Sequence, residues 1–179
     1  MLKIINDLIE SQKLCCIFSN SSDTDKFALG YILSKDDDFI LMENISPYGQ
    51  YDGISCILIE NIIKIEHETE YAKNMRKVFD YYGNKRLEKI KISSDVILTI
   101  FNYINETRKL CFIELCNSDN DDCCGFIKEF DDKTVQIISV KNDGLFDGES
   151  IINVGDISYI SCDDQENRIV EVLNRINNR

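Results

Sequence analysis

The chain has few of the residues on which many active sites depend. Its 179 residues include one histidine, His67, and one proline, Pro47. No glycine-rich phosphate loop and no Ser-His-Asp spacing is present. A lone histidine between an expected strand and an expected helix is more typical of a surface or capping residue than of a catalytic base. We therefore expect no catalytic residue and a protein that is not an enzyme.

Basic residues and long apolar runs are also scarce. Lys and Arg number 20 against 32 Asp and Glu, which gives a net charge of −12. Such a chain is poor in the clustered cations that contact phosphates, so nucleic acids and anionic membranes are disfavoured as partners. No apolar run is long enough to cross a bilayer, and the first residues predict a helix and not a signal peptide. We expect a cytoplasmic protein whose acidic surface gives solubility or attracts a basic protein partner.

The clearest positive feature is an internal repeat. Gly30 is followed six positions later by Asp36, and the same spacing returns as Gly125 and Asp131, 95 positions further along. This offset stays constant as far as Ile65. A repeat of this kind is the signature of one structural unit used twice.

Each unit has the pattern of a helix, five short strands and a second helix. Apolar stripes at helical spacing predict the leading helices over residues 2–12 and 94–106. Short β-branched runs separated by polar turns predict the strands. The strands are expected at residues 14–19, 27–33, 39–45, 54–59 and 62–66, and again at 110–116, 124–130, 134–140, 151–154 and 157–161. A trailing helix follows each set.

These elements predict an α+β fold that is mainly β. Because five short strands behind one helix would otherwise leave long bare edges, each sheet should bend strongly. We expect two tandem five-stranded bent sheets or small barrels, each with an N-terminal and a trailing C-terminal helix. The first domain covers residues 1–86 and the second covers residues 90–179.

Glycines and aspartates recur at matching places, and both residue types suit turns. Glycine adopts backbone angles that other residues avoid, and aspartate accepts hydrogen bonds from its own turn. A ligand loop is the alternative to a bulged turn. The predicted turn residues are Gly30, Asp36, Asp37, Gly49, Asp52 and Gly53, and their counterparts Gly125, Asp131, Asp132, Gly144, Asp147 and Gly148.

The eight cysteines do not form a disulfide framework. Cys15 aligns with Cys111, but Cys56 aligns with Ile151, so most thiols replace an apolar strand residue. Free cysteine behaves as a small buried hydrophobe, and we expect reduced thiols.

The sequence contains two candidate metal sites, and neither has the spacing of a known site. A zinc set of Cys111, Cys116, Cys123 and Cys124 matches no common knuckle. Residues 119–122 resemble the start of a calcium loop, but its twelfth position is Phe130 and not glutamate. We expect no metal and no cofactor.

The repeat resembles the Sm-like (LSm) family. The first motif of that family has the spacing of Gly30 and Asp36, and its second motif is similar to residues 157–160 and, more loosely, to 62–65. The resemblance covers residues 2–66 and 94–161. It implies small β-barrels that join edge to edge through their fourth and fifth strands. One unit could then pair with the other, and the remaining edges predict a homo-oligomer.

The departures from that family weaken an RNA-binding role. The position of the family's RNA-contacting asparagine is occupied by Ile40 and Val135, and no arginine stands in the second motif. Bases could still stack on exposed aromatic rings. The candidates for stacking are Tyr48, Tyr51 and Phe146.

We therefore expect a non-enzymatic protein-interaction module that acts as an adapter or as an immunity-type inhibitor of a basic partner. One alternative is an RNA-binding Sm-like protein with non-standard contact residues. A second is a thiol-dependent enzyme that uses Cys15 and Cys16, or Cys123 and Cys124.

Overall fold

The computed structural model describes residues 1–20, 23, 25–84, 86–87, 90–116 and 122–178. The first unit contains α1 (Leu2–Ser11), β1 (Cys15–Phe18), β2 (Ala28–Lys35), β3 (Phe39–Ile45), β4 (Tyr51–Leu58), the 3₁₀ turn η1 (Ile59–Asn61), β5 (Lys64–His67) and α2 (Glu70–Tyr81). The second unit contains α3 (Val96–Thr107), β6 (Leu110–Leu115), β7 (Cys123–Phe130), β8 (Thr134–Val140), β9 (Phe146–Asn153), η2 (Val154–Asp156), β10 (Ile157–Cys162) and α4 (Gln165–Asn177).

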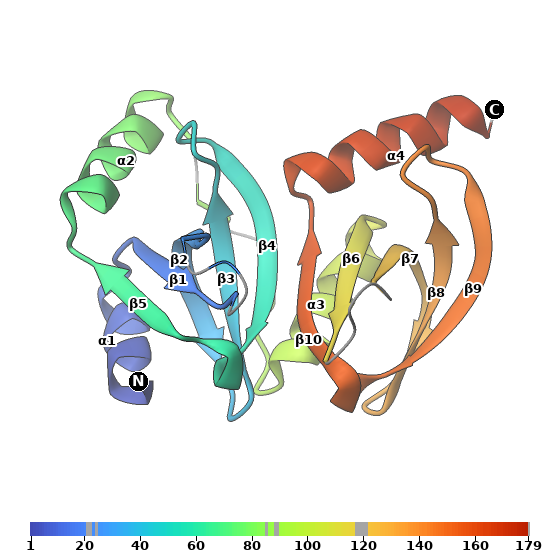
Figure 1. Cartoon of the computed structure of the whole chain (residues 1–179), viewed down its shortest axis with the longest axis horizontal. Coiled ribbons are helices and arrows are strands. Elements are labelled where there is room, and N and C mark those ends of the chain that lie inside the picture. The colour runs from blue at the N-terminus through green and yellow to red at the C-terminus, as the bar shows by residue number, and fades with distance from the viewer. Residues whose placement is uncertain (21–22, 24, 85, 88–89, 117–121, 179) are drawn as a thin grey trace.

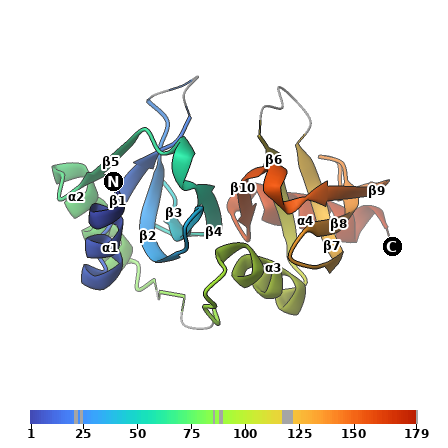
Figure 2. The same cartoon turned by 90° about the horizontal axis from the view of Figure 1, so that it is seen from below.

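All ten strands form one continuous sheet. Their order is β5-β1-β2-β3-β4-β10-β6-β7-β8-β9, and every neighbouring pair is antiparallel. The prediction of two tandem five-stranded small barrels is therefore wrong, although the mainly β content is as expected. The two halves lie side by side, and β4 and β10 meet between them (Figures 1 and 2).

A shared hydrophobic core explains why the sheet does not divide. One cluster of buried residues contains Phe39 and Cys56 from the first unit together with Ile100, Ile137 and Ile160 from the second. Helix α3 lies against β3 and β4 of the first unit as well as against β7 of its own unit. Because α3 covers strands on both sides of the β4–β10 pair, the two units bury apolar surface together.

The ends of the helices have clear local causes. Asp95 accepts a hydrogen bond from the Leu98 N–H (2.8 Å) and caps the start of α3. Helices α1 and α3 end in the same way, with Gln12 (φ 50°) and Arg108 (φ 53°) in the left-handed conformation. The residues of α1 and β1 therefore correspond to those of α3 and β6 that lie 96 positions later. After the β1–β2 loop, corresponding residues lie 95 positions apart.

The main error in element boundaries concerns β9. The sequence predicts a strand over residues 151–154, but β9 begins at Phe146. After Phe146, residues Asp147, Gly148 and Glu149 are exposed and none has an apolar side chain, so no apolar alternation marks them. The strand forms because β8 supplies its backbone partners along the whole length.

Among the residues that the structure describes, no helix has the length and apolar character needed to cross a membrane.

Candidate functional site

The joint between the two units is the best-defined interaction surface in the molecule. Strands β4 and β10 pair with Ile57 opposite Tyr159, Cys56 opposite Ile160 and Ser55 opposite Ser161. We call this pairing, together with the contacts around the β10–α4 corner, the central joint. It is a pairing of the fourth strand of one unit with the fifth strand of the other.

The β10–α4 corner fits closely onto the start of β4. Asp163 has a left-handed backbone (φ 57°), and Asp164 caps α4 by accepting from the Asn167 N–H (2.8 Å). A Cβ atom on Gly53 would lie 2.2 Å from the Cys162 carbonyl oxygen, so only glycine permits this approach.

Charged and polar side chains complete the corner. The Oδ1 atom of Asp52 accepts from the backbone N–H of Gln165 (2.9 Å) and lies 3.5 Å from an Nη atom of Arg168. On the other side of the corner, Lys109 Nζ donates to Asp163 Oδ1 (2.7 Å), and the Tyr51 hydroxyl donates to Asp163 Oδ2 (3.4 Å). Asp52 and Tyr51 therefore both make contacts in the central joint, and Asp52 is more than a turn residue.

The two outer strands of the sheet, β5 and β9, repeat the two halves of the central joint. Strand β9 is the counterpart of β4, and β5 is the counterpart of the second part of β10. The β5–α2 corner has the same form as the β10–α4 corner, with Glu68 left-handed (φ 59°) and Thr69 capping the helix. Lys13 pairs with Glu68 (2.6 Å) as Lys109 pairs with Asp163.

No described part of the chain packs against β9 in the way that the β10–α4 corner packs against β4 in the central joint. Gly148 is the counterpart of Gly53 and has the same kind of backbone (φ 85°), but no described atom lies within 4 Å of a Cβ built on it. Ile151 is the counterpart of the fully buried Cys56 and is 73% exposed. Within the described part of the chain, the outer edge of β9 therefore pairs with no strand.

Helix α1 is open at the other end of the sheet. Ile97 and Ile100 of α3 are buried in the core shared by the two units. Their counterparts are Met1, directly before α1, and Ile4 in α1, which are 54% and 38% exposed. Apolar side chains at α1 and the apolar side chain of Ile151 in β9 are therefore exposed at opposite ends of the same sheet.

The free β9 end differs from β4 by being more polar. Leu41 and Ile54, which lie in the core shared by the two units, are replaced by Gln136 and Glu149. The Glu149 carboxylate accepts from Gln136 Nε2 and from Lys128 Nζ, and the nearby Lys128 ammonium holds the pKa of Glu149 below its usual value. Any partner at this end gains less from apolar burial than the central joint does.

The predicted turn aspartates occupy turns in both units. Asp36 Oδ1 accepts from the N–H groups of Asp38 and Phe39, and Asp131 Oδ1 accepts from those of Lys133 and Thr134. These backbone hydrogen bonds lower the pKa of Asp131. The second oxygen of Asp36 accepts from the Val96 N–H (2.8 Å), which links the first unit to the start of α3.

The remaining predicted turn residues fall into two groups. Asp37 and Asp132 are exposed in the turns after β2 and β7, and Asp147 is exposed near Lys141 (3.1 Å). The glycines instead allow close approaches between elements. Gly30 and Gly125 lie within β2 and β7 and not in turns, and they face carbonyl oxygens of the next strand. Gly49 and Gly144 face α2 and α4.

The three stacking candidates do not form one platform. Tyr48 is 74% exposed in the β3–β4 turn, and Tyr51 is engaged with Asp163 in the central joint. Phe146, the counterpart of Tyr51, lies on the outer strand β9 and is 52% exposed. No set of adjacent bases could stack on all three.

The cysteines are free, and five of the eight are buried: Cys15, Cys16, Cys56, Cys111 and Cys162. Burial raises the pKa of Cys15 to about 12 and that of Cys16 to about 11. It also raises the pKa of Cys124 to about 11. Thiols of this kind are protonated near neutral pH, which is unfavourable for a thiolate nucleophile.

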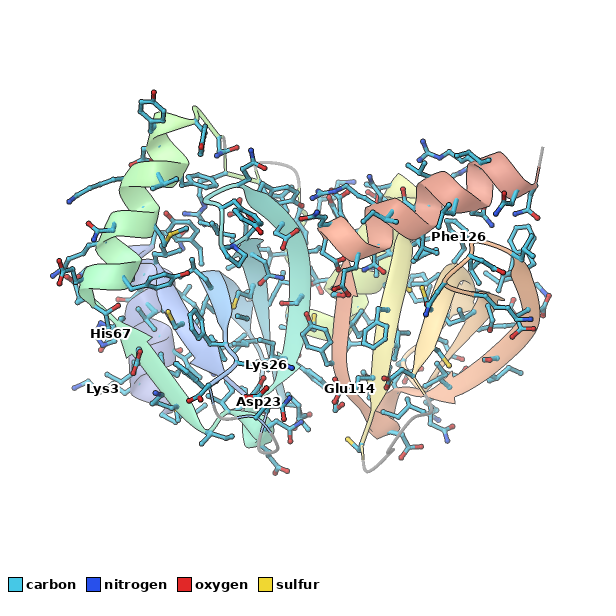
Figure 3. The ribbon with its side chains drawn as sticks, turned by 45° about the horizontal axis from the view of Figure 1, so that its top comes forward. Lys3, Asp23, Lys26, His67, Glu114 and Phe126 are labelled. Carbon is cyan, nitrogen blue, oxygen red and sulfur yellow. The ribbon has the colours of Figure 1, made fainter. Side chains whose placement is uncertain are left out.

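His67 lies exposed at the end of the outer strand β5 (Figure 3). Its register partner is Cys15, but the Cys15 thiol donates to the Gly30 carbonyl (3.6 Å). No described atom links the two side chains as a Cys–His pair.

Within the described ranges, no group of three or more His, Cys, Asp or Glu side chains is placed to hold a metal ion. Cys111 of the considered zinc set is buried in the core. Residues 119–121 of the considered calcium loop lie outside the described residues.

Two buried carboxylates were not anticipated from the sequence. Glu43 in β3 is fully buried and accepts from Arg86 Nε (2.6 Å) and from the Leu87 N–H (2.8 Å). Glu171 in α4 is 4% exposed and accepts from the Leu110 N–H (2.9 Å). The available signal for Glu43 was an acidic residue inside the apolar run of residues 39–45.

Comparisons with known proteins add little. No family model matches the chain, and no curated protein matches it. Among solved structures, the chain has a weak likeness to YcgR from Escherichia coli in complex with c-di-GMP, at 7% identity and a TM-score of 0.21, over 99% of this chain and 89% of that one. A TM-score this low does not show a shared fold.

Proposed function

We propose that this protein is a non-enzymatic interaction module that binds partners by strand addition at the ends of its sheet, and that another copy of the chain is the first such partner. The observation that supports this proposal is the central joint. The chain already contains one β4–β10 contact, and its two free ends repeat both sides of that contact.

The central joint specifies the register of the proposed contact. Strand β9 of one copy pairs with β5 of the next, as β4 pairs with β10. Shifting the register of the central joint by 95 positions places Lys64 opposite Ile152, Ile65 opposite Ile151, Glu66 opposite Ser150 and His67 opposite Glu149. The mode of joining, a fourth strand against a fifth, is also the one that the resemblance to the Sm-like family implies.

The corner contacts have counterparts as well. Asp147 of one copy takes the place of Asp52, and Lys73 of the next takes the place of Arg168. The N–H group of Glu70 replaces that of Gln165 as a donor to the aspartate. Meanwhile α1 of the second copy covers Ile151 with Met1 and Ile4. Because Gln136 and Glu149 make this contact more polar than the central joint, association is weaker and depends on concentration.

Light scattering after size exclusion tests the proposal. The average mass of the natural chain should rise with concentration above that of one chain. Ile151→Lys should remove this rise, because the new charge would be buried beneath α1 of the second copy. Gly148→Ala should also weaken association, since its counterpart Gly53 has no room for a Cβ atom.

Val172→Lys is the matched control, because Val172 is 51% exposed on α4 and gains the same charge away from β5 and β9. It should associate like the natural chain. A strict monomer over a wide range of concentration, or equal association of the Ile151→Lys and Val172→Lys variants, would contradict self-association through these strands.

The proposal also includes a basic protein as the partner. This protein would then act as an adapter or as an immunity-type inhibitor. The net charge of −12 supports electrostatic attraction to such a partner. A pull-down from cell extract should then recover basic proteins that are released by salt. Recovery of acidic or uncharged proteins alone would argue against this form.

A further inference from the structure

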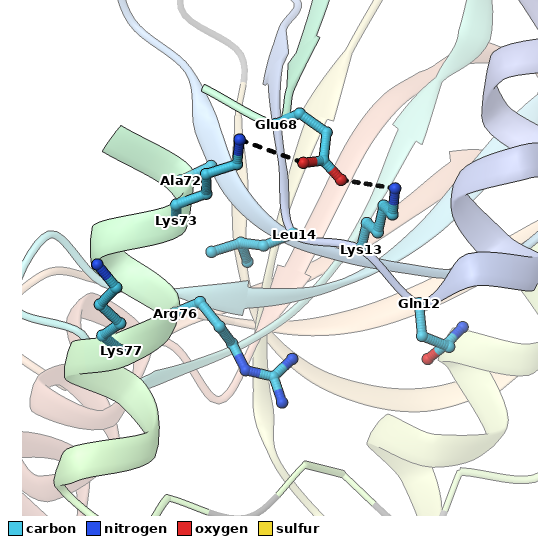
Figure 4. Close-up of a pocket in the computed structure, with 8 residues that line it drawn as sticks. All are labelled: Gln12, Lys13, Leu14, Glu68, Ala72, Lys73, Arg76 and Lys77. Carbon is cyan, nitrogen blue, oxygen red and sulfur yellow. Dashed lines mark ion pairs between the residues drawn. The ribbon is translucent and has the colours of Figure 1, made fainter. Parts of the chain in front are cut away.

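A cationic hollow lies between the end of α1 and the helix α2, as the close-up in Figure 4 shows. Its volume is about 380 Å³. The lining includes four basic side chains, one carboxylate and the apolar residue Leu14. These are Lys13, Lys73, Arg76 and Lys77, together with Glu68.

The hollow is unusual for a chain with a net charge of −12. Glu68 is shared between Lys13 (2.6 Å) and Lys73 (3.4 Å), so one carboxylate faces two ammonium groups. Their hydrogen bonds and charges lower the pKa of Glu68, which keeps it ionised.

Arg76 and Lys77 complete the positive side of the hollow. Arg76 uses Nε to contact Asp80 (2.9 Å) and Nη1 to donate to the Tyr31 hydroxyl (2.7 Å), which fixes its guanidinium plane. Among the residues that the structure describes, the partner of Lys77 Nζ is a neutral group, the side-chain oxygen of Asn74 (3.3 Å). Positive charge therefore exceeds negative charge along the hollow.

In the second unit, a carboxylate of the chain itself occupies the place that corresponds to the hollow. There the Leu110 N–H donates to Glu171 Oε1 (2.9 Å), and Glu171 Oε2 lies 3.3 Å from an Nη atom of Arg175. The counterparts of Leu110 and Glu171 in the first unit are Leu14 and Arg76. An arginine has no acceptor atom, so the first unit lacks the carboxylate that its duplicate holds at this point.

We propose that the hollow is a binding site for a carboxylate group supplied by a ligand. One carboxylate oxygen accepts from the Leu14 N–H, as Glu171 accepts from Leu110. The other is paired by Arg76, with Lys73 and Lys77 adding charge-assisted hydrogen bonds. A free organic acid and an acidic side chain of a peptide both present this group. The inference does not rest on the proposed association through β5 and β9.

Amide NMR of the ¹⁵N-labelled full chain at low ionic strength tests the site. Three probes are titrated separately: succinate, inorganic phosphate and a peptide of five glutamates. The Leu14 and Lys73 amide signals should shift and saturate, with a dissociation constant on the order of 1 mM or tighter. Saturation by succinate points to a free acid, and saturation by the peptide alone points to an acidic segment. Phosphate alone would contradict a carboxylate site.

Arg76→Glu is the decisive variant, because it copies the arrangement of Glu171 in the second unit. Its own carboxylate should occupy the place of the ligand, so binding should weaken at least tenfold and the Leu14 amide should be shifted before any probe is added. Lys77→Gln keeps the Arg76 contacts and should weaken binding severalfold. This second variant tests the site even if Arg76→Glu disturbs α2 through repulsion with Asp80.

Lys128→Gln is the matched control for charge, since Lys128 lies in β7 of the other unit. It should bind the probes like the natural chain. An unmoved Leu14 signal, or shifts that do not saturate and are equal in the Arg76→Glu and Lys128→Gln proteins, would overturn the proposal. Lys128→Gln removes an ion pair to Glu149 of β9, but self-association is measured on the natural chain and on the Ile151→Lys and Val172→Lys proteins. A failure here is therefore separable from a failure of self-association.

Discussion

At the scale of single residues, several aspartates in this protein serve the backbone. Asp36 and Asp131 hold turns, and Asp95 and Asp164 begin helices. Glu43 has another role, because its buried carboxylate fixes Arg86 and Leu87, beyond the end of α2, onto β3. The guanidinium of Arg86 also lies over the Tyr31 ring, 3.7 Å from its centroid.

The buried thiols predict a loss of stability at alkaline pH. Burial holds the pKa of the buried Cys15 and Cys16 and of the half-buried Cys124 above the ordinary value near 9.0. A raised pKa in the folded state means that stability is fully present below the unfolded-state pKa and falls as pH rises toward the folded-state pKa. The thermal midpoint in reducing buffer should therefore be nearly constant up to about pH 8.5 and fall between about pH 9 and 12.

Cys15→Ala provides the comparison for this prediction. The variant should be less stable near neutral pH because it leaves a small cavity, but its midpoint should fall less steeply above pH 9. If the natural protein and the variant had parallel pH profiles, the Cys15 thiol would not be the titrating group.

At the scale of elements, a strand or helix of one unit can be covered by another part of the chain while its counterpart in the other unit is exposed. Strand β4 and helix α3 are covered in the central joint, whereas their counterparts β9 and α1 carry exposed apolar residues. The same backbone conformation therefore occurs once in a tight contact and once in the open. This difference gives matched pairs of positions within one chain.

Gly53 and Gly148 form such a pair for measuring stability. Replacement by alanine strains a left-handed backbone at both sites, at a cost of about 1–2 kcal/mol. Only in Gly53→Ala would the new Cβ also meet backbone atoms, at 2.2 Å from Cys162 O and 2.5 Å from Asp164 N. Urea unfolding at concentrations where the chain is monomeric should show Gly53→Ala to be less stable than Gly148→Ala by about 1–3 kcal/mol. Equal losses would mean that the β10–α4 corner does not depend on this approach.

At the scale of the whole molecule, the two ends of the sheet are different and complementary. Contacts between unlike surfaces are heterologous, and they generate a ring if the rotation closes and an open chain if it does not. Each copy has one β9 end and one end formed by β5 and α1. Assembly should therefore continue beyond a dimer.

Mixing two variants tests this polarity. Ile151→Lys inactivates the β9 end, and Ile4→Lys inactivates the α1 end, so neither variant should associate alone. In the mixture each supplies the end that the other lacks, and the product should stop at a dimer of one copy of each. Light scattering of the mixture would count against head-to-tail association if it showed monomers only, or species larger than a dimer.

The resemblance between residues 30–65 and 125–160 was sufficient to predict repeated elements, because glycines, aspartates and apolar residues act locally in turns, strands and helices. It was not sufficient to predict how the units combine. Whether a sheet stops after five strands depends on what covers its edge, and residues far apart in the chain decide that. The sequence did not predict the start of β9 or the burial of the Glu43 carboxylate, for the same reason. The partners of these residues, in β8 and beyond the end of α2, are specified by tertiary contacts.

The order of the elements, the turn positions and the acidic surface were thus determined by the sequence alone, since each depends on a residue and its near neighbours. The single ten-stranded sheet, the corner around Gly53 and the cationic hollow beside Leu14 were decided only by the tertiary structure. These three features depend on backbone pairing and on charges brought together from separate parts of the chain, and no local pattern records such distances.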